Sequence, residues 1–343
     1  MSHILQALDL LTQNQDLPGE LASAVIQDLL AGELTPTQIG GLLFGLRVKG
    51  ESAEELASFA RTLREAGQHI EAPEGAVDTC GTGGDRAGTF NISTTAAFIV
   101  AGAGVPVAKH GGRFASGHCG SADVLEYLGI PLSAKPEQSE QALKKVGITF
   151  LFAQLYHPAM AKVASQRREL GIRTIFNLLG PLLNPANAPY QLLGVSALSV
   201  LPTMAKALQL LGIQRAIVMV GEDGLDEVSL SGPTQAILVN GDELIDFVIT
   251  PEEFGFKRCS INEIKGGSPE ENAHITLSIL QGEKGPKRDI VLLNAGTALF
   301  ATHKAKSIAE GIALATESLD SGRALEKLEQ LRQSLQPELT ACN

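Results

Sequence analysis

The chain has 343 residues, of which 44% are hydrophobic, and its formal net charge at pH 7 is -11. This length allows one large domain or two ordinary domains with a sizeable apolar core. The acidic balance and the absence of Trp argue against a nucleic-acid partner, because phosphate backbones need clustered Lys and Arg and single strands need aromatic platforms.

Helical patterns fill residues 3–66. Thr35-Pro36-Thr37-Gln38 and Ser52-Ala53-Glu54-Glu55 match the capping box, in which a hydroxyl and a side chain three residues later exchange hydrogen bonds with the main chain. The glycines that predict helix ends are Gly32, Gly50 and Gly67. We therefore expect a helical N-terminal domain over residues 1–70.

A glycine-rich loop at residues 78–94 is the first candidate site. It reads Asp-Thr-Cys-Gly-Thr-Gly-Gly-Asp-Arg-Ala-Gly-Thr-Phe-Asn-Ile-Ser-Thr, between a predicted strand at Val77–Cys80 and a predicted buried helix at Ala96–Val107. Its glycines let main-chain N–H groups approach an anion, and the helix N-terminus also favours negative charge. The candidate N-caps of this helix are Ser93, Thr94 and Thr95. Such a loop predicts a phosphate site, although glycine-rich loops often serve only as connections.

The loop matches neither of two common phosphate fingerprints. A P-loop needs Gly-Lys followed by Ser or Thr, whereas Gly84 is followed by Asp85 and Arg86. A dinucleotide fingerprint needs a third glycine where this chain has Arg86. Asp85 indicates that the loop faces a metal ion or a sugar hydroxyl.

A second strand, glycine-rich loop and helix follow at residues 105–129. A predicted strand at Val105–Ala108 precedes Lys-His-Gly-Gly-Arg-Phe-Ala-Ser-Gly-His-Cys-Gly-Ser, with Ser121 as the expected N-cap. Lys109 and Arg113 supply positive charge, although basic residues on a loop are usually just solvated. In a parallel sheet the two loops would open on the same edge.

Two adjacent carboxylates, Asp226 and Glu227, follow a predicted strand at Ala216–Val220. Alone, such a pair is more often a solvated turn. Beside two phosphate loops it predicts a Mg²⁺ site, because Mg²⁺ is often held by one or two carboxylates and substrate phosphates.

Further strands are predicted at Thr149–Ala153, Gln191–Val195 and Ala236–Val239. Strands alternate with helices from Val77 onward, which is typical of an α/β domain. We expect a smaller all-α domain followed by an α/β domain over residues 71–343.

Together these segments resemble the anthranilate phosphoribosyltransferase family of tryptophan biosynthesis. The resemblance also includes Arg167-Arg168-Glu169-Leu170-Gly171-Ile172-Arg173-Thr174, Asn177-Leu178-Leu179-Gly180-Pro181-Leu182-Leu183-Asn184-Pro185 and Gly266-Gly267-Ser268-Pro269-Glu270-Glu271-Asn272-Ala273. It implies a nucleoside phosphorylase/phosphoribosyltransferase type of fold, with a mixed central sheet flanked by helices. It implies transfer of the phosphoribosyl group of 5-phosphoribosyl 1-pyrophosphate to anthranilate, with release of pyrophosphate and use of Mg²⁺, as the second step of tryptophan synthesis from chorismate.

The resemblance also assigns site residues. The donor, phosphoribosyl pyrophosphate, would be bound by Gly81, Gly84, Asp85, Thr89, Asn91, Ile92, Ser93, Thr94, Lys109, Ser116, Gly117 and Ser121. Anthranilate would be bound by Gly81, His110, Gly112, His157 and Arg167. The metal would be held by Ser93, Asp226 and Glu227.

The expected catalytic residues are Lys109 and Arg167. Lys109 and Mg²⁺ would neutralise the leaving pyrophosphate, and Arg167 would orient the acceptor. An aromatic amine is nearly unprotonated at neutral pH, so no strong general base is required.

Two residues depart from the family on the acceptor side. Gly112 stands where the family has Asn, and Gln154 stands where it has Pro. One alternative is therefore the same donor chemistry on another aromatic amine. A pyrimidine nucleoside phosphorylase is a second alternative, although its Lys-x-Ser-Thr-Gly-Gly pattern is missing from Asp78-Thr79-Cys80-Gly81. A third is a non-catalytic relative that binds nucleic acid, which the acidic charge disfavours.

The resemblance further implies that about residues 158–185 join the helical domain and that this domain forms a homodimer. The four cysteines, Cys80, Cys119, Cys259 and Cys342, lack metal-ligand spacing and are expected to be reduced thiols in a cytoplasm. No targeting or membrane segment is expected.

Overall fold

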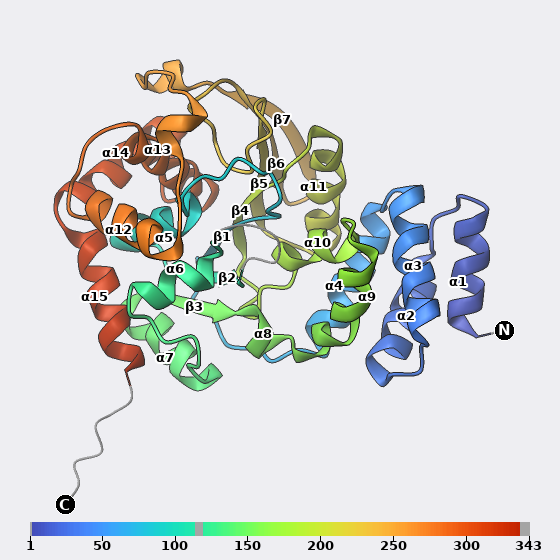
Figure 1. Ribbon diagram of the computed structural model, residues 1–343. Helices are drawn as coiled ribbons and strands as arrows, with labels where there is room; N and C mark the ends of the chain where they lie inside the picture. Colours follow the sequence, from blue (N-terminus) through green and yellow to red (C-terminus); the bar gives the residue numbers. More distant parts are fainter. Residues whose placement is uncertain (1, 114–118, 337–343) are drawn as a thin grey trace, which may run out of the picture.

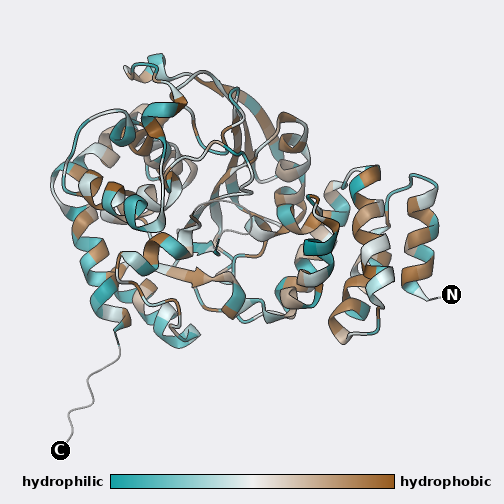
Figure 2. Cartoon of the chain, in the orientation of Figure 1, coloured by the Kyte–Doolittle hydropathy of each residue, from teal (hydrophilic) through white to brown (hydrophobic). Residues whose placement is uncertain are grey.

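The computed structural model describes residues 2–113 and 119–336. The N-terminal part is a helical bundle, shown in blue in Figure 1. Its helices are α1 (His3–Thr12), α2 (Gly19–Ala31), α3 (Pro36–Lys49) and α4 (Ala53–Glu65). Both expected capping boxes are formed: the Thr35 hydroxyl accepts from the Gln38 N–H, and the Ser52 hydroxyl accepts from the Glu55 N–H. Figure 2 shows hydrophobic residues recurring along these helices.

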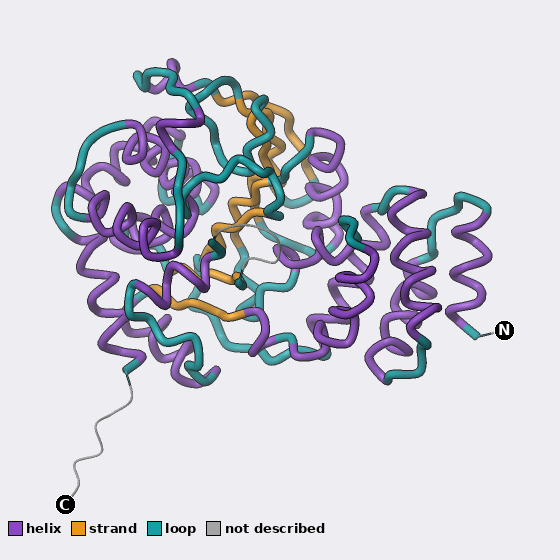
Figure 3. The backbone as a smooth tube through the Cα atoms, viewed as in Figure 1, coloured by secondary structure: helices purple, strands orange, loops and turns teal. Residues whose placement is uncertain are grey.

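A seven-stranded mixed sheet follows, in the order β3-β2-β1-β4-β5-β6-β7. The strands are β1 (Val77–Gly81), β2 (Val107–Gly111), β3 (Ile148–Phe152), β4 (Tyr190–Gly194), β5 (Arg215–Gly221), β6 (Thr234–Asn240) and β7 (Glu243–Ile249). The first five are parallel, and β6 and β7 are added antiparallel. Figure 3 shows the strands as one twisted layer between helices. The predicted fold class, an α/β sheet with a smaller helical domain, is confirmed.

Helices cover both faces of the sheet. Between the strands lie α5 (Ile92–Gly102), α6 (Ser121–Tyr127), α7 (Pro136–Val146) and α11 (Leu201–Leu210). The C-terminal helices are α12 (Pro269–Leu280), α13 (Pro286–Ala301), α14 (Ile308–Asp320) and α15 (Arg323–Leu335). Successive strand residues enter opposite cores, as a two-residue period requires. Leu192 packs with α5 and α13, whereas Leu193 packs with α4 and α11.

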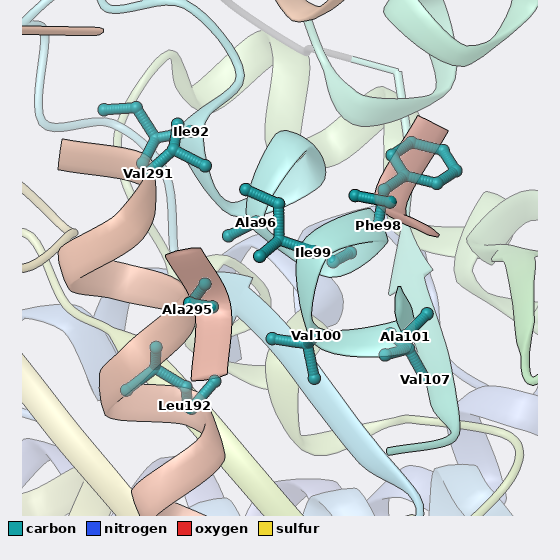
Figure 4. Packing of buried hydrophobic residues seen from close by; sticks show 14 of the residues in the cluster. Ile92, Ala96, Phe98, Ile99, Val100, Ala101, Val107, Leu192, Val291 and Ala295 are labelled. Atoms are coloured by element: carbon teal, nitrogen blue, oxygen red, sulfur yellow. The ribbon is translucent and has the colours of Figure 1, made fainter. Parts of the chain in front are cut away.

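The core on the α5 side is densely apolar. Figure 4 shows Ile92, Ala96 and Ile99 of α5 near Val291 and Ala295 of α13 and above the sheet. Because α5 is buried over almost its whole surface, the loop that precedes it is held at one fixed end.

The segment between β3 and β4 returns to the helical bundle. It contains α8 (Ala153–Tyr156), α9 (Ala164–Leu170) and α10 (Ile175–Leu179), with short 3₁₀ turns at Pro158–Val163 and Gly180–Leu182. In this segment α9 contacts α3, and α10 contacts α4.

The structure corrects three local predictions. The helix expected at Ala96–Val107 begins earlier, at Ile92, and ends at Gly102, because Gly104 turns the chain with φ +87° into β2. Its N-cap position is held by Asn91, not by a hydroxyl residue, and makes no side-chain cap bond. Ser121 is the first helical residue of α6 rather than its cap, which is Gly120. No described helix has both the length and the apolarity needed to cross a bilayer.

Candidate functional site

The site lies where the strand order reverses. From β1 the chain proceeds outward to β2 and β3, and then returns to β4 on the other side of β1. Ligands of open α/β sheets bind at such a switch point, beyond the carboxyl ends of the strands. Here the last residues of β1 and β4 are both glycines, and Gly81 pairs with Gly194.

These paired glycines make room for Asp226. A Cβ at Gly81 would overlap the Asp226 carboxylate, and a Cβ at Gly194 would overlap its main-chain carbonyl. The carboxylate accepts a hydrogen bond from the Gly83 N–H at 2.7 Å. The loop after β5 therefore lies directly over the two strand ends and touches the glycine-rich loop.

Glu227 faces the start of α5. Its carboxylate accepts from the Ser93 N–H at 3.0 Å, and the residue is buried. Burial raises the pKa of Glu227, and the neighbouring Asp226 raises it further. Burial likewise raises the pKa of Asp226, with Asp85 of the glycine-rich loop adding to the effect. Crowded carboxylates with raised pKa values fit a divalent cation, which would relieve their mutual repulsion.

The described residues contain no cluster of three His, Cys, Asp or Glu side chains able to hold a metal ion. Oxygen ligands nevertheless lie close by: the Glu227 carboxylate is bonded to Ser93, and the Asp226 carboxylate adjoins Asp85. This donor set suits Mg²⁺, which keeps waters and takes further oxygens from substrate phosphates.

Lys109 crosses from β2 to β1 beneath the loops. Its ammonium group donates to the Thr79 carbonyl and lies 3.5 Å from the Ser93 hydroxyl. The residue is only 4% exposed, so its charge is fixed in place. The site therefore has both signs of charge: Asp226 and Glu227 supply the negative charge that a bound metal ion requires, and Lys109 supplies the positive charge that an anionic substrate requires.

The glycine-rich loop is held on its outer side by the segment after η5, the 3₁₀ turn Ile261–Ile264. Thr89 forms an isolated bridge with Lys265, and the Gly266 N–H donates to the Gly88 carbonyl at 3.0 Å. Gly84 has φ +79°, a backbone conformation that favours glycine. The Gly266-Gly267 motif thus contacts the glycine-rich loop directly.

Asn91 is held by a small polar network. Its side-chain carbonyl accepts from Asn272 at 3.0 Å and from the Cys119 thiol at 3.3 Å. Ile92 and Thr94 are buried, so their side chains belong to the packing of α5.

The second loop is described in part. Ser116 and Gly117 lie outside the described residues. Ser121 stands over Gly111, where a Cβ would overlap its hydroxyl. Arg113 does not join Lys109: its guanidinium donates to Asp123 at 2.8 Å and to Glu126 at 2.9 Å.

The two acceptor-side histidines lie together. The ring centroids of His110 and His157 are 5.4 Å apart in an edge-to-face arrangement. Burial, together with the neighbouring His157, lowers the pKa of His110 to about 3. His157 is bonded through Nε2 to the Leu183 carbonyl at 2.6 Å. Burial lowers the pKa of His157 as well, so both rings are uncharged at neutral pH.

The other acceptor-side residues are more dispersed. Arg167 lies on α9, half-buried, with its guanidinium 5.7 Å from the Phe176 ring centroid. Gln154 is exposed on α8. Gly112 has space beside it, since a Cβ there would find Ala153 as its nearest neighbour at 3.8 Å.

One contact of the glycine-rich loop, made by Arg173, was not predicted from the sequence. Arg173 donates to the Ser196 hydroxyl at 2.6 Å and to the Gly83 carbonyl at 3.4 Å, and it lies against Gly84. The only signal was its place in the Arg-Arg-Glu-Leu-Gly-Ile-Arg-Thr motif.

Comparison with known proteins covers the whole architecture. Residues 5–67 match the helical bundle domain of a glycosyl transferase family, and residues 73–325 match its a/b domain. The anthranilate phosphoribosyltransferase of Desulfitobacterium hafniense (strain Y51) is 70% identical over 331 residues, 96% of this chain and 98% of that protein. The enzyme of that name from Pelotomaculum thermopropionicum is 49% identical over 329 residues, 96% of this chain and 95% of its own.

Solved structures agree with these relatives. Anthranilate phosphoribosyltransferase from Thermus thermophilus superposes with a TM-score of 0.92 at 45% identity, covering 98% of this chain and 99% of that one. The Saccharomyces cerevisiae enzyme, in complex with phosphoribosyl pyrophosphate and Mg, has a TM-score of 0.87 at 30% identity, covering 97% of both chains. None of these proteins is named a nucleoside phosphorylase, so that alternative gains no support. The chain belongs to the anthranilate phosphoribosyltransferase family of glycosyl transferases.

Proposed function

We propose that this protein transfers the phosphoribosyl group of 5-phosphoribosyl 1-pyrophosphate to anthranilate, giving N-(5-phosphoribosyl)anthranilate and pyrophosphate. The observation that carries the proposal is the placing of Asp226 and Glu227 over the paired glycines, beside the glycine-rich loop and buried Lys109. The relatives named anthranilate phosphoribosyltransferase give the substrates.

The donor binds along the two loops at the carboxyl edge of the sheet. Main-chain N–H groups of the glycine-rich loop meet the phosphates, and the dipole of α5 adds positive potential at its N-terminus. The other donor contacts that we assign are Gly81, Gly84, Asp85, Thr89, Asn91, Ile92, Ser93, Thr94, Lys109, Ser116, Gly117 and Ser121.

Charge neutralisation drives the departure of pyrophosphate. When bound at Ser93, Asp226 and Glu227, Mg²⁺ supplies positive charge to the leaving oxygens. Lys109 adds a fixed ammonium that needs no rearrangement, since the Thr79 carbonyl already holds it. Stabilising charge where it develops is the main contribution that these residues make.

The acceptor requires positioning more than activation. Arg167 orients the anthranilate carboxylate so that the amine meets the anomeric carbon, while Gly81, His110, Gly112 and His157 line the remaining contacts. The neutral, buried rings of His110 and His157 suit an aromatic substrate. No proton needs to be taken from the amine before attack.

The test of this function uses purified protein, Mg²⁺, phosphoribosyl pyrophosphate and a panel of aromatic amines. We expect loss of anthranilate fluorescence matched by release of pyrophosphate, and no reaction after chelation of Mg²⁺. Pyrophosphate release only with a different amine would refute anthranilate as the acceptor while keeping the donor chemistry. Phosphorolysis of a nucleoside without added Mg²⁺ would refute both.

Gly112 sets the expected strength of acceptor binding. A Cβ at Gly112 would meet no atom closer than Ala153 at 3.8 Å, so we expect Gly112→Asn to restore the family's amide contact. We expect the Michaelis constant for anthranilate to fall, corresponding to roughly 0.5–1.5 kcal/mol for the added hydrogen bonds. Gly112→Ala, which fills space without an amide, is the control. An unchanged constant in Gly112→Asn would refute a role for this position.

We further propose the organisation of the protein. Residues 1–70 with about 158–185 form a helical domain, and residues 71–343 form the donor-binding α/β domain. The helical domain carries a homodimer interface, supported by exposed apolar side chains at Leu5, Phe44 and Val48. The protein works in the cytoplasm, where its cysteines stay reduced.

A further inference from the structure

The strands β1 and β2 do not pair through their main chains toward their carboxyl ends, which leaves a gap in the hydrogen-bond ladder. Their main-chain pairing is recorded only at Val77 and Val107, whereas β1 pairs with β4, and β2 with β3, through five residues each. The gap opens immediately below the two phosphate loops. Side chains must therefore satisfy the main-chain groups that face the gap, because buried polar groups without partners are costly.

Asp78 and Asn184 fill this gap. The Asp78 carboxylate accepts from the His110 N–H at 3.2 Å and from the Asn184 amide at 2.7 Å. The same Asn184 amide nitrogen donates to the Ala108 carbonyl at 2.7 Å. Asn184 thus joins a side chain of β1 to the main chain of β2.

The orientation of Asn184 is fixed by its other end. Its side-chain carbonyl accepts from the Ala186 N–H at 2.9 Å, so the amide nitrogen must face Asp78 and Ala108. The residue is 4% exposed, and all of its hydrogen-bonding side-chain atoms have partners. Such a side chain acts as a spacer of defined length between the strands.

Asn184 also links the two substrate sides. It follows Leu183, whose carbonyl is bonded to His157, and it lies beside the strand that carries Lys109 and His110. Lys109 crosses the same gap to reach Thr79. The position of its ammonium therefore depends on the distance between β1 and β2.

We propose that Asn184, paired with Asp78, is a positioning residue for the reaction: it sets the separation of β1 and β2 and thereby places Lys109 for the pyrophosphate of the donor. This inference rests on the proposed function, because it gives Asn184 its purpose through the role of Lys109. The pair acts through Lys109 and does not touch the substrate itself.

Charge makes the pair testable. Burial raises the pKa of Asp78 to about 6, opposed by Lys109, the Asn184 amide and the His110 N–H, while the Cys80 thiol also faces it. In Asn184→Asp two carboxyl groups would meet in the gap. At low pH the two carboxyl groups would share a proton, so that the protonated one donates a hydrogen bond to the other. At higher pH that proton is lost, and the two negative charges would repel each other.

The experiment compares Asn184→Asp, Asn184→Leu and the parent protein at about pH 6 and about pH 8.5, with the same donor and Mg²⁺. For Asn184→Asp we expect kcat/KM for phosphoribosyl pyrophosphate to stay within about threefold of the parent at the lower pH and to fall at least about tenfold below it at the higher pH. Asn184→Leu, which cannot donate at any pH, should be at least about tenfold impaired at both. Asn187→Asp is the matched control, because Asn187 is exposed in the same segment. The kcat/KM of this variant relative to the parent should not change with pH.

Two results would overturn the inference. One is a kcat/KM for phosphoribosyl pyrophosphate that stands in the same ratio, Asn184→Asp to parent, at both pH values. The other is unfolding of Asn184→Asp at the higher pH, seen by thermal melting, in place of lost donor affinity, seen by calorimetry. If Asn184→Leu does not fold, the pH comparison within Asn184→Asp still decides, because returning that protein to low pH must restore activity. A parent without phosphoribosyl transfer would instead refute the proposed function.

Discussion

Two glycines decide where the acidic pair can lie. Gly194 is in close contact with the main chain of Asp226, and Gly81 with its carboxylate. A single methyl group at either position must displace the loop after β5. The position of the loop after β5 is thus constrained by the space at the ends of β1 and β4, and not only by the chemistry of Asp226 and Glu227.

Replacing Gly194 should move Asp226 and Glu227 away from the glycine-rich loop. We expect Gly194→Ala to destabilise the protein by roughly 1–3 kcal/mol, the usual cost of overpacking, and to abolish Mg²⁺-dependent activity. Urea unfolding and steady-state kinetics would measure the two effects. Gly232→Ala is the control, since a Cβ there has no neighbour within 4 Å. Normal activity in Gly194→Ala would contradict the contact.

The acidic pair should make the metal-free protein less stable as pH rises. Burial raises the pKa of Asp226 and of Glu227, so the folded state retains protons that the unfolded chain loses near pH 4. Their contribution to stability is complete below the unfolded pKa and disappears as pH rises through the raised folded pKa. Urea midpoints in a chelator should therefore fall with pH, less so in Asp226→Asn. Added Mg²⁺ should reverse the fall, and identical pH slopes in both proteins would argue against this account.

Individual residues were predictable where a contiguous motif carried them. The sequence placed Lys109 at the start of a glycine-rich loop and Asp226 and Glu227 in the loop after a strand, so one common sheet edge followed from topology, although Lys109 lies within β2. Arg173 and Asn184 were not assigned, because their partners at Gly83 and Asp78 are far away in the chain. Sequence spacing does not encode such contacts.

The cap of α4 supports the helical bundle. Glu55 is fully buried and accepts from the Leu17 N–H and the Ser52 N–H, each at 2.8 Å, with the Lys49 ammonium at 2.9 Å. One carboxylate therefore joins the start of α4 to the loop before α2 and to the end of α3.

Removal of this carboxylate should be costly. Glu55→Ala leaves the N–H groups of Leu17 and Ser52 without their acceptor, while the Lys49 ammonium keeps Asp16 and the Gly50 carbonyl, and we expect a loss of about 2–4 kcal/mol. Thr35→Ala removes the corresponding capping hydroxyl at the exposed start of α3 and should cost about 1 kcal/mol. Denaturant titration of both variants would give the comparison. Equal losses would show that the buried network adds nothing beyond the cap.

The elements with strong local signals were the ones predicted well. Capping boxes and glycines located the N-terminal helices, and short apolar runs located β1 to β6. The strand β7 was missed, since Leu244, Ile245 and Val248 remain exposed at the sheet edge and give no two-residue alternation. The start of α5 was placed too late, because the residues from Ile92 to Thr95 read as loop, whereas Ile92, Thr94 and Thr95 are buried in the helix.

At the level of the assembly, the apolar side chains on α1 and α3 predict dimerisation. Phe44 is 54% exposed and Val48 is 68% exposed, one helical turn apart. We expect Phe44→Glu to shift the protein to monomers in sedimentation experiments, because a buried charge at the contact would lack a partner. Leu244→Glu, on the distant strand β7, should leave the assembly unchanged. A dimer that survives Phe44→Glu would place the interface elsewhere.

The apolar core beneath α4, α10 and α11 is continuous with one face of the sheet, since Phe59 and Leu179 belong to the same cluster as Leu193 and Val218. The boundary near residue 70 is thus a boundary along the chain but not through the interior. A protein made of residues 71–343 alone would lack Phe59 and its neighbours, and the apolar side chains on that face of the sheet would be exposed to water. The two halves of this enzyme are therefore separable as sequences and inseparable as folding units.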